Sequence, residues 1–286
     1  MKVKAWAKLN LNLHLIPKKL ENGLFPVKFL NCELDLADEL IIKKNKNIIR
    51  VICNNKELSI QKNNLVYKAG ILLKEFTGNK QFGVEIILKK NIPIKAGFGG
   101  GSSDAAATLK ALIKFWRVKI SKKELNKIAG QLGKDVYYSL IGGLCEVLED
   151  GSKVNKLKFN APRLNVIIIT PVEVKPSTGA MYQDLNINEI GKNLYKFDQL
   201  KKTLLKKDLH RVIKSLHNDF ESLAIRNFPI LKEIKRDLIK NGALNTQLAG
   251  SGLSLVGFFE NSIEAKKAFS NLKIIYENII WTKIKS

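Results

Sequence analysis

The chain departs most from an average composition over one segment, Pro93-Ile-Lys-Ala-Gly-Phe-Gly-Gly-Gly-Ser-Ser-Asp-Ala-Ala-Ala107. Before it, apolar residues recur at every second position of residues 82–89, which predicts a strand. After it, apolar residues recur at helical spacing from Ala105 to Trp116, which predicts a helix. The sequence therefore predicts a glycine-rich connection between a strand and a helix.

The glycines of this segment can form an anion-binding loop. Glycine allows positive φ and a close approach of backbone to ligand, and the following helix directs its free N–H groups to the same place. Ser102 and Ser103 add hydroxyls that can cap the helix, bind a phosphate oxygen or reach a metal ion. We interpret residues 97–103 as a nucleotide triphosphate loop, with a flexible serine-capped turn as the alternative. The segment is not a Walker A loop, because the sequence contains no GxxxxGK(S/T). It is not a Rossmann fingerprint either, because Ser102 stands at the third-glycine position of GxGxxG.

Strict alternation marks the N-terminal strand, where residues 7–15 place leucines on one face and polar residues on the other. This pattern predicts a strand with one buried face. Lys8 and Asn10 share the polar face, and a lone lysine there is usually solvated. Asp135 reads by itself as a turn aspartate, and Gly250-Ser251-Gly252 as a tight backbone approach or a plain turn.

Helices and strands are mixed without regular βαβ alternation, which favours an α+β fold with mostly antiparallel sheets. We place the domain boundary within residues 155–163. This gives an N-terminal domain of residues 1–158 and a C-terminal domain of residues 159–286. Further elements are predicted as strands at residues 34–45, 47–53, 144–148, 165–170 and 253–259, and as helices at residues 64–76, 121–132 and 263–272.

Composition excludes several classes of protein. The formal net charge is +23, but the lysines are spread along the whole chain beside many Ile and Asn residues, so nucleic acid is an unlikely partner. Three cysteines without a CxxC pair indicate neither a disulfide framework nor a zinc ribbon. The strongest apolar run, residues 166–169, is far shorter than the ~20 residues that span a bilayer. The alternating N-terminus is unlike a signal peptide, so we expect a cytoplasmic protein without a membrane partner.

The three histidines form no recognisable metal motif. His14 is expected to be a hydrogen-bonded polar residue of the first strand. His210 and His217 stand seven residues apart, and without a third ligand they are expected at a surface or between helices.

Three motifs, in order along the chain, resemble those of the kinases named for galactokinase, homoserine kinase, mevalonate kinase and phosphomevalonate kinase, the GHMP kinases. They are the lysine-bearing strand Ala7-Lys-Leu-Asn-Leu11, the loop at residues 93–107 and the segment Ala249-Gly-Ser-Gly252. Within the family, the chain is most similar to the branch that phosphorylates the 2-hydroxyl of 4-diphosphocytidyl-2-C-methyl-D-erythritol in the non-mevalonate isoprenoid pathway. Matching stretches of that branch lie at residues 64–69, 97–106, 133–137 and 218–221.

The resemblance implies a two-domain kinase with a ribosomal-protein-like N-terminal domain and a ferredoxin-like C-terminal domain. It implies Asp135 as the catalytic aspartate and Lys8 as its partner, since a carboxylate can accept the proton of an attacking hydroxyl and an ammonium keeps it ionised. ATP is the implied phosphoryl donor, with Mg²⁺ near Ser103. The implied nucleotide-binding residues are Asn64, Leu65, Pro93, Ile94, Lys95, Ala96, Gly97, Phe98, Gly99, Gly100, Gly101, Ser102 and Ser103.

The acceptor implied by the resemblance is a small, anionic alcohol bound by a monomer or homodimer. Its implied contacts are Asn10, Leu24, Phe25, Tyr182, Gly250, Ser251 and Gly252. The chain reads Asn22-Gly-Leu-Phe25 where this branch has Asp-Gly-Tyr-His, so the side chains that hold cytosine in the branch are replaced by apolar ones. Tyr137 also replaces a proline. Two alternatives stay open: a kinase for mevalonate, a mevalonate phosphate, homoserine or a sugar, and a non-catalytic nucleic-acid-binding relative.

Overall fold

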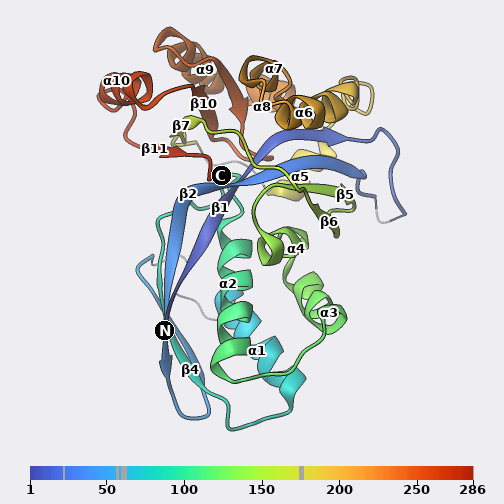
Figure 1. Cartoon of the computed structure of the whole chain (residues 1–286), viewed down its shortest axis with the longest axis vertical. Coiled ribbons are helices and arrows are strands. Elements are labelled where there is room, and N and C mark those ends of the chain that lie inside the picture. The colour runs from blue at the N-terminus through green and yellow to red at the C-terminus, as the bar shows by residue number, and fades with distance from the viewer. Residues whose placement is uncertain (22, 56–57, 59–62, 174–176, 286) are drawn as a thin grey trace. The chain divides into compact units, whose positions relative to one another are not determined.

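The computed structural model describes residues 1–21, 23–55, 58, 63–173 and 177–285, so that Asn22 lies outside the described residues. The chain folds into two compact units, each assembled from separate stretches (Figure 1). The first unit comprises Met1–Lys8, Leu36–Ile94 and Gly99–Gly142, and the second comprises Leu9–Asp35, Lys95–Phe98 and Gly143–Ser286.

The first unit packs helices on one sheet. Its strands follow the order β3-β4-β2-β1, with β3 parallel to β4 and β4 antiparallel to β2. Alternate residues of β4, Val84, Ile86 and Leu88, are buried against apolar residues of the helices such as Leu73 and Leu109. The strands are β1 (Lys2–Leu15), β2 (Val27–Lys44), β3 (Ile49–Cys53) and β4 (Val84–Lys89), and the helices are α1 (Leu65–Thr77), α2 (Gly100–Phe115), α3 (Lys122–Leu132) and α4 (Lys134–Ile141).

The second unit contains a four-stranded antiparallel sheet in the order β11-β7-β10-β9. Numbered along the chain this is the order 4-1-3-2, which confirms the expected ferredoxin-like arrangement. The sheet strands are β7 (Asn165–Ile169), β9 (Asn245–Leu248), β10 (Leu255–Phe259) and β11 (Ile279–Lys283). The other elements are β5 (Cys145–Glu149), β6 (Lys153–Lys156), β8 (His217–Asn218), α5 (Thr178–Gln183), α6 (Tyr195–Leu205), α7 (Leu209–Lys214), α8 (Glu221–Asn227), α9 (Ile230–Lys240) and α10 (Ser262–Leu272).

Local sequence signals set most element ends. Ser121 and Glu124 form a capping box at the start of α3, and Gly78 ends α1 in the left-handed conformation. The start of α2 differs from the prediction. Gly99 is its N-cap residue, with φ 64°, and no side chain caps the helix, so Ser102 and Ser103 lie inside the first turn. Three adjacent glycines allow the helix to begin earlier than the apolar stripe alone indicates.

Strand β1 is buried on both faces from Ala7 onward, so the prediction of one buried face is wrong. Alternation reports the chemistry of each face, but it does not report whether a second layer covers the polar one. Each compact unit is also discontinuous in sequence, because β1 and β2 each contribute residues to both. A sequence division between residues 158 and 159 remains a prediction.

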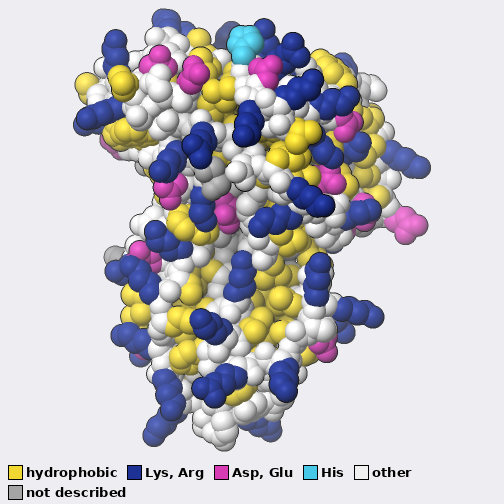
Figure 2. Space-filling model, viewed as in Figure 1, with side chains coloured by type: hydrophobic (Ala, Val, Ile, Leu, Met, Phe, Trp, Pro, Cys, Tyr) yellow, Lys and Arg dark blue, Asp and Glu magenta, His cyan; other side chains and the backbone are white. Residues whose placement is uncertain are grey.

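On the face shown in Figure 2, Lys and Arg alternate with hydrophobic and neutral side chains and form no continuous stripe. Among the residues that the structure describes, none of the helices combines the length and the apolar character needed to cross a membrane.

Candidate active site

Lys8 and Asp135 lie together in the first unit. The Lys8 side chain extends from β1 and is 8% exposed, whereas the Asp135 side chain, in the first turn of α4, is 44% exposed. Lys8 Nζ and Asp135 Oδ2 are 4.0 Å apart. Gly133, with φ 141°, separates α3 from α4 and turns the chain so that Asp135 begins a new helix. The helix dipole favours a carboxylate at this position. The two predicted catalytic residues are thus brought together.

The glycine-rich loop passes directly beside this pair. A Cβ added at Gly99 would lie 2.9 Å from Lys8 Cγ and 3.7 Å from Asp135 Oδ2. The φ of +64° at Gly99 is one that other residues rarely adopt. Glycine is therefore required here both by backbone conformation and by space.

The start of α2 presents an anion-binding helix end in the same unit. The first N–H groups of any helix have no intrahelical partner, and here they belong to Gly100, Gly101 and Ser102. Ser103 is largely buried, and its hydroxyl donates to the carbonyl of Trp6 at 2.7 Å. This bond ties the loop to β1 two residues before Lys8.

A buried charged network lies against the start of α2, and the sequence did not predict it. Lys90 Nζ donates to Asp38 and, at 2.7 Å, to Asp104 Oδ2. Asp38 also accepts from the backbone N–H groups of Asn91 and Ile92. The network joins the end of β4 to the second turn of α2. A charged residue directly after an alternating strand, and an aspartate inside an alanine-rich helix start, were the available signals.

Burial and charge act in opposite directions in this network. Burial alone would lower the pKa of Lys90, but the carboxylates of Asp104 and Asp38 outweigh it and raise that pKa. Burial also raises the pKa of Asp104 well above its usual value, with Lys90 opposing the shift. Removing Lys90 would leave two buried carboxyl groups without their cation.

In the second unit, the C-terminal glycine-rich segment packs on the other half of the loop. A Cβ at Gly97 would lie 1.9 Å from the Ala249 carbonyl oxygen, and one at Gly252 would lie 2.7 Å from the carbonyl carbon of Ala96. The backbones therefore touch, as the sequence interpretation of a tight approach requires. Asn218 holds the segment by donating to the carbonyls of Leu248 at 2.8 Å and Gly250 at 2.7 Å.

The residues expected to contact the acceptor also lie in the second unit. Asn10 is buried and donates to Asn31 Oδ1 at 2.6 Å. Leu24 is 40% exposed, whereas Phe25 is 2% exposed, with Lys19 Nζ over its ring at 5.7 Å. Tyr182 is half-buried and meets Phe220 edge to face, with ring centroids 4.9 Å apart. Of the two residues that replace the tyrosine and histidine of the related branch, only Leu24 is substantially exposed.

The residues expected near adenine lie in the first unit. Asn64 caps α1 by accepting from the Val66 N–H at 2.9 Å, and its amide donates to the carbonyl of Leu58. Leu65 is half-buried, and its Cδ1 would lie 3.4 Å from a Cβ at Gly101. Asn64 therefore has a structural role whether or not a nucleotide is bound.

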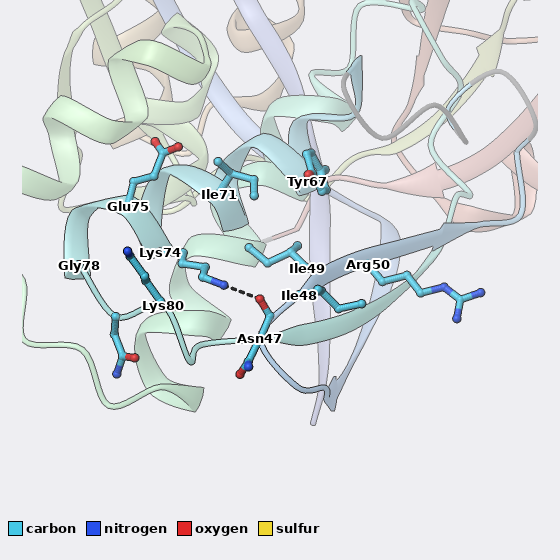
Figure 3. A pocket seen from close by; sticks show the side chains of 11 residues that line it. Asn47, Ile48, Ile49, Arg50, Tyr67, Ile71, Lys74, Glu75, Gly78 and Lys80 are labelled. Atoms are coloured by element: carbon cyan, nitrogen blue, oxygen red, sulfur yellow. Dashed lines mark hydrogen bonds between the residues drawn. The ribbon is translucent and has the colours of Figure 1, made fainter.

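A cavity of about 720 Å³ lies elsewhere in the first unit (Figure 3). Its lining comes from the start of β3 and the outer face of α1, where Lys74 donates to the carbonyl of Asn47 at 2.6 Å. None of the residues predicted for the nucleotide or the acceptor lines this cavity. It is separate from the Lys8–Asp135 site.

Comparison with known proteins agrees with this arrangement. The pattern of the GHMP kinases N terminal domain matches residues 64–143, and that of the GHMP kinases C terminal domain matches residues 200–278. The chain is 37% identical to a 4-diphosphocytidyl-2-C-methyl-D-erythritol kinase of Caldicellulosiruptor bescii, over 99% of this chain and 97% of that one. The chain belongs to the GHMP kinase family. This GHMP kinase is also 34% identical to the Clostridium novyi enzyme of the same name, over 98% of each chain.

Solved structures lead to the same family. A crystal structure of 4-(cytidine 5'-diphospho)-2C-methyl-D-erythritol kinase superposes with a TM-score of 0.85, at 27% identity over 100% of both chains. A homoserine kinase from Cytophaga hutchinsonii superposes with a TM-score of 0.74 at 22% identity, over 99% of this chain and 94% of that one, and shows the shared fold alone. This GHMP kinase is therefore an ATP-dependent kinase that acts on a small molecule.

Proposed function

We propose that this GHMP kinase transfers the γ-phosphoryl group of ATP to the 2-hydroxyl of 4-diphosphocytidyl-2-C-methyl-D-erythritol. The observation that carries the reaction type is the Lys8–Asp135 pair against the glycine-rich loop. The choice of acceptor is supported by the relatives above, which match the whole chain and are named for this substrate.

Asp135 acts as the proton acceptor. The acceptor hydroxyl attacks the γ-phosphorus, its O–P bond forms as the bond from the γ-phosphorus to the bridging oxygen breaks, and ADP leaves with that oxygen. The hydroxyl proton passes to the Asp135 carboxylate and then to solvent. The partial exposure of Asp135 is consistent with this exchange.

Lys8 holds a positive charge beside Asp135 and offsets the negative charge of the transferring group. Two unit charges 4 Å apart attract by about 4 kcal/mol at an effective dielectric constant of about 20. Because Asp135 is partly exposed, solvent reduces this value, and the pair functions mainly by position.

We assign the phosphates of ATP to the start of α2, where free N–H groups and the helix dipole favour an anion. Ser103 suits Mg²⁺, because its hydroxyl hydrogen is donated to Trp6 and its oxygen keeps lone pairs for another partner. Mg²⁺ is bound in such sites by one or two protein oxygens, together with phosphate oxygens and water. When bound, it neutralises phosphate charge.

The acceptor is assigned to residues of the second unit: Asn10, Leu24, Phe25, Tyr182 and residues 250–252. Tyr182 offers a half-buried ring for a base, and the exposed Leu24 offers apolar contact. The side chains of Leu24 and Phe25 carry no hydrogen-bonding group for the cytosine edge. We therefore assign that role to backbone groups. A diphosphate acceptor also suits the strongly positive chain.

The test is an acceptor panel under fixed ATP and Mg²⁺, read by coupled ADP release. It includes the diphosphocytidyl compound, mevalonate, phosphomevalonate, homoserine and galactose. Turnover confined to the diphosphocytidyl compound supports the proposal. Turnover of another alcohol with that compound inert overturns the acceptor but leaves the kinase in place.

A further inference from the structure

Two of the three histidines meet one aspartate in the second unit. His14 lies near the end of β1, and the parallel pairing of β1 with β8 places Asn12 opposite His217. The rings of His14 and His217 stack with centroids 4.7 Å apart and planes 21° apart. Donor atoms of His14, His217 and Asp219 all lie within 4.8 Å of one another. The sequence expectation that His217 lies at a surface or between helices is therefore wrong.

His14 is completely buried, and neither of its ring nitrogens has a hydrogen-bond partner. The expectation of a hydrogen-bonded strand residue is also wrong. A neutral imidazole carries one donor and one acceptor, and buried polar groups in native proteins are almost always paired. A neutral imidazole with unpaired nitrogens is a ready ligand for a metal ion.

Asp219 is fixed by contacts independent of His14. Its Oδ2 accepts from the N–H groups of Leu15 at 2.8 Å and Gly191 at 3.1 Å, and its Oδ1 lies 2.7 Å from His217 Nε2. Burial would raise the pKa of Asp219, but these hydrogen bonds outweigh it and lower the pKa. The Asp219 carboxylate is thus a fixed oxygen ligand beside both imidazoles.

We propose that His14, His217 and Asp219 bind a divalent transition-metal ion of the zinc class. Two imidazoles and one carboxylate suit Zn²⁺, whereas Mg²⁺ prefers oxygen ligands. Tetrahedral zinc with bonds of about 2.1 Å places its ligand atoms about 3.4 Å apart. Binding therefore opens the 2.7 Å hydrogen bond between His217 Nε2 and Asp219 Oδ1 and rotates the stacked imidazole rings so that each directs a nitrogen at the ion, while the more distant ligand atoms close by up to about 1.4 Å. Lys28 and Lys196 act electrostatically on His14 and oppose a cation, so the carboxylate of Asp219 is essential to the site.

The ion would fasten the end of β1 to the segment that follows β8. The same strand carries Lys8 and Asn10, but neither belongs to the ligand set. The proposal is therefore one of a structural metal, and it does not depend on which alcohol the kinase phosphorylates.

The experiment uses the full chain without a histidine tag, stripped of metal and titrated with Zn²⁺ against a chromophoric chelator. We expect one equivalent bound with micromolar or tighter affinity. His14→Phe and Asp219→Asn should each weaken binding at least 100-fold. The control is His210→Phe, which changes the exposed histidine of α7 and should bind as the wild type does. Because His14→Phe could disturb the core, His14→Gln is measured beside it, with thermal unfolding as a check on folding.

Cobalt gives an independent identification of the ligands. Co²⁺ in the site should give visible d–d absorption without a thiolate charge-transfer band, since no cysteine belongs to the set. Any one of three results overturns the proposal. They are the lack of stoichiometric binding in the wild type, wild-type affinity in folded His14→Gln, and a thiolate band that reports binding by Cys32, Cys53 or Cys145.

Discussion

Replacing Gly99 by alanine should reduce phosphoryl transfer far more than it reduces stability. Gly99 has φ +64°, and an alanine there costs about 1–2 kcal/mol of backbone strain. The added Cβ would also lie 2.9 Å from Lys8 Cγ, against an ordinary contact of about 3.5–4.0 Å. Because Cγ is close to the strand, Lys8 must shift its stem by roughly 0.5–1 Å. A misplacement of this size costs about 100-fold in rate.

Gly78 provides a matched control. It has φ +65°, and nothing lies within 4 Å of the Cβ that alanine would add. Gly78→Ala therefore has the strain of Gly99→Ala without the contact with Lys8. Each 1 kcal/mol should lower Tm by about 2–4 °C in a chain of this size.

The assay is coupled ADP release, with Tm measured on the same preparations. We expect Gly99→Ala to lose about 100-fold in kcat and Gly78→Ala to stay within twofold of the wild type, at similar Tm. If Gly99→Ala kept the kcat of Gly78→Ala, the position of Lys8 against the loop would not matter to the reaction, and the reasoning above would be wrong.

Three further substitutions test the parts that hold the site in place. Asn218→Leu removes both donors to the C-terminal glycine-rich segment and should lower the free energy of unfolding by about 2–4 kcal/mol in urea, while exposed Asn271→Leu should change it little. Lys90→Met leaves two buried carboxyl groups without their cation and should cost about 3–5 kcal/mol, with Asp104→Asn in the same chain recovering part of the loss. Ser103→Ala should raise the Mg²⁺ concentration needed for half-maximal turnover, and an unchanged requirement would place the metal elsewhere.

The pairing of Lys8 with Asp135 was implied by the resemblance to the GHMP kinases, whereas the glycine-rich loop was predicted from its own residues. Gly99 lies against the Lys8 side chain and Gly97 against the Ala249 backbone, and neither position has room for a Cβ. The glycines in the sequence therefore indicate both contacts. Antiparallel sheets were expected from the lack of regular βαβ alternation, and the ferredoxin-like C-terminal domain was implied by the resemblance. The prediction started α2 too far along the chain, because glycine has a low helix propensity. Glycine is nevertheless required at this helix start, because neighbouring atoms leave little room for a Cβ.

Contacts between distant segments could not be predicted from local pattern. The polar face of β1 looked solvent-exposed, although Asn10 and His14 are buried there. Lys90 and Asp38 are 52 positions apart in the chain, and no periodicity records their pairing. Asn218 and Asp219 were recognised by resemblance alone, and only the structure shows the carbonyls and N–H groups that they satisfy.

The central claim is that Asp135 accepts the proton of the attacking hydroxyl, and replacing it by asparagine tests this most directly. The control is Asp198→Asn, which changes another exposed aspartate in the first turn of a helix. Turnover of 4-diphosphocytidyl-2-C-methyl-D-erythritol and ATP affinity are measured for both. Asp135→Asn should lose about 10²–10⁴-fold in kcat with ATP affinity unchanged, and Asp198→Asn should match the wild type. A folded Asp135→Asn enzyme that turns over within threefold of the wild type would contradict the account.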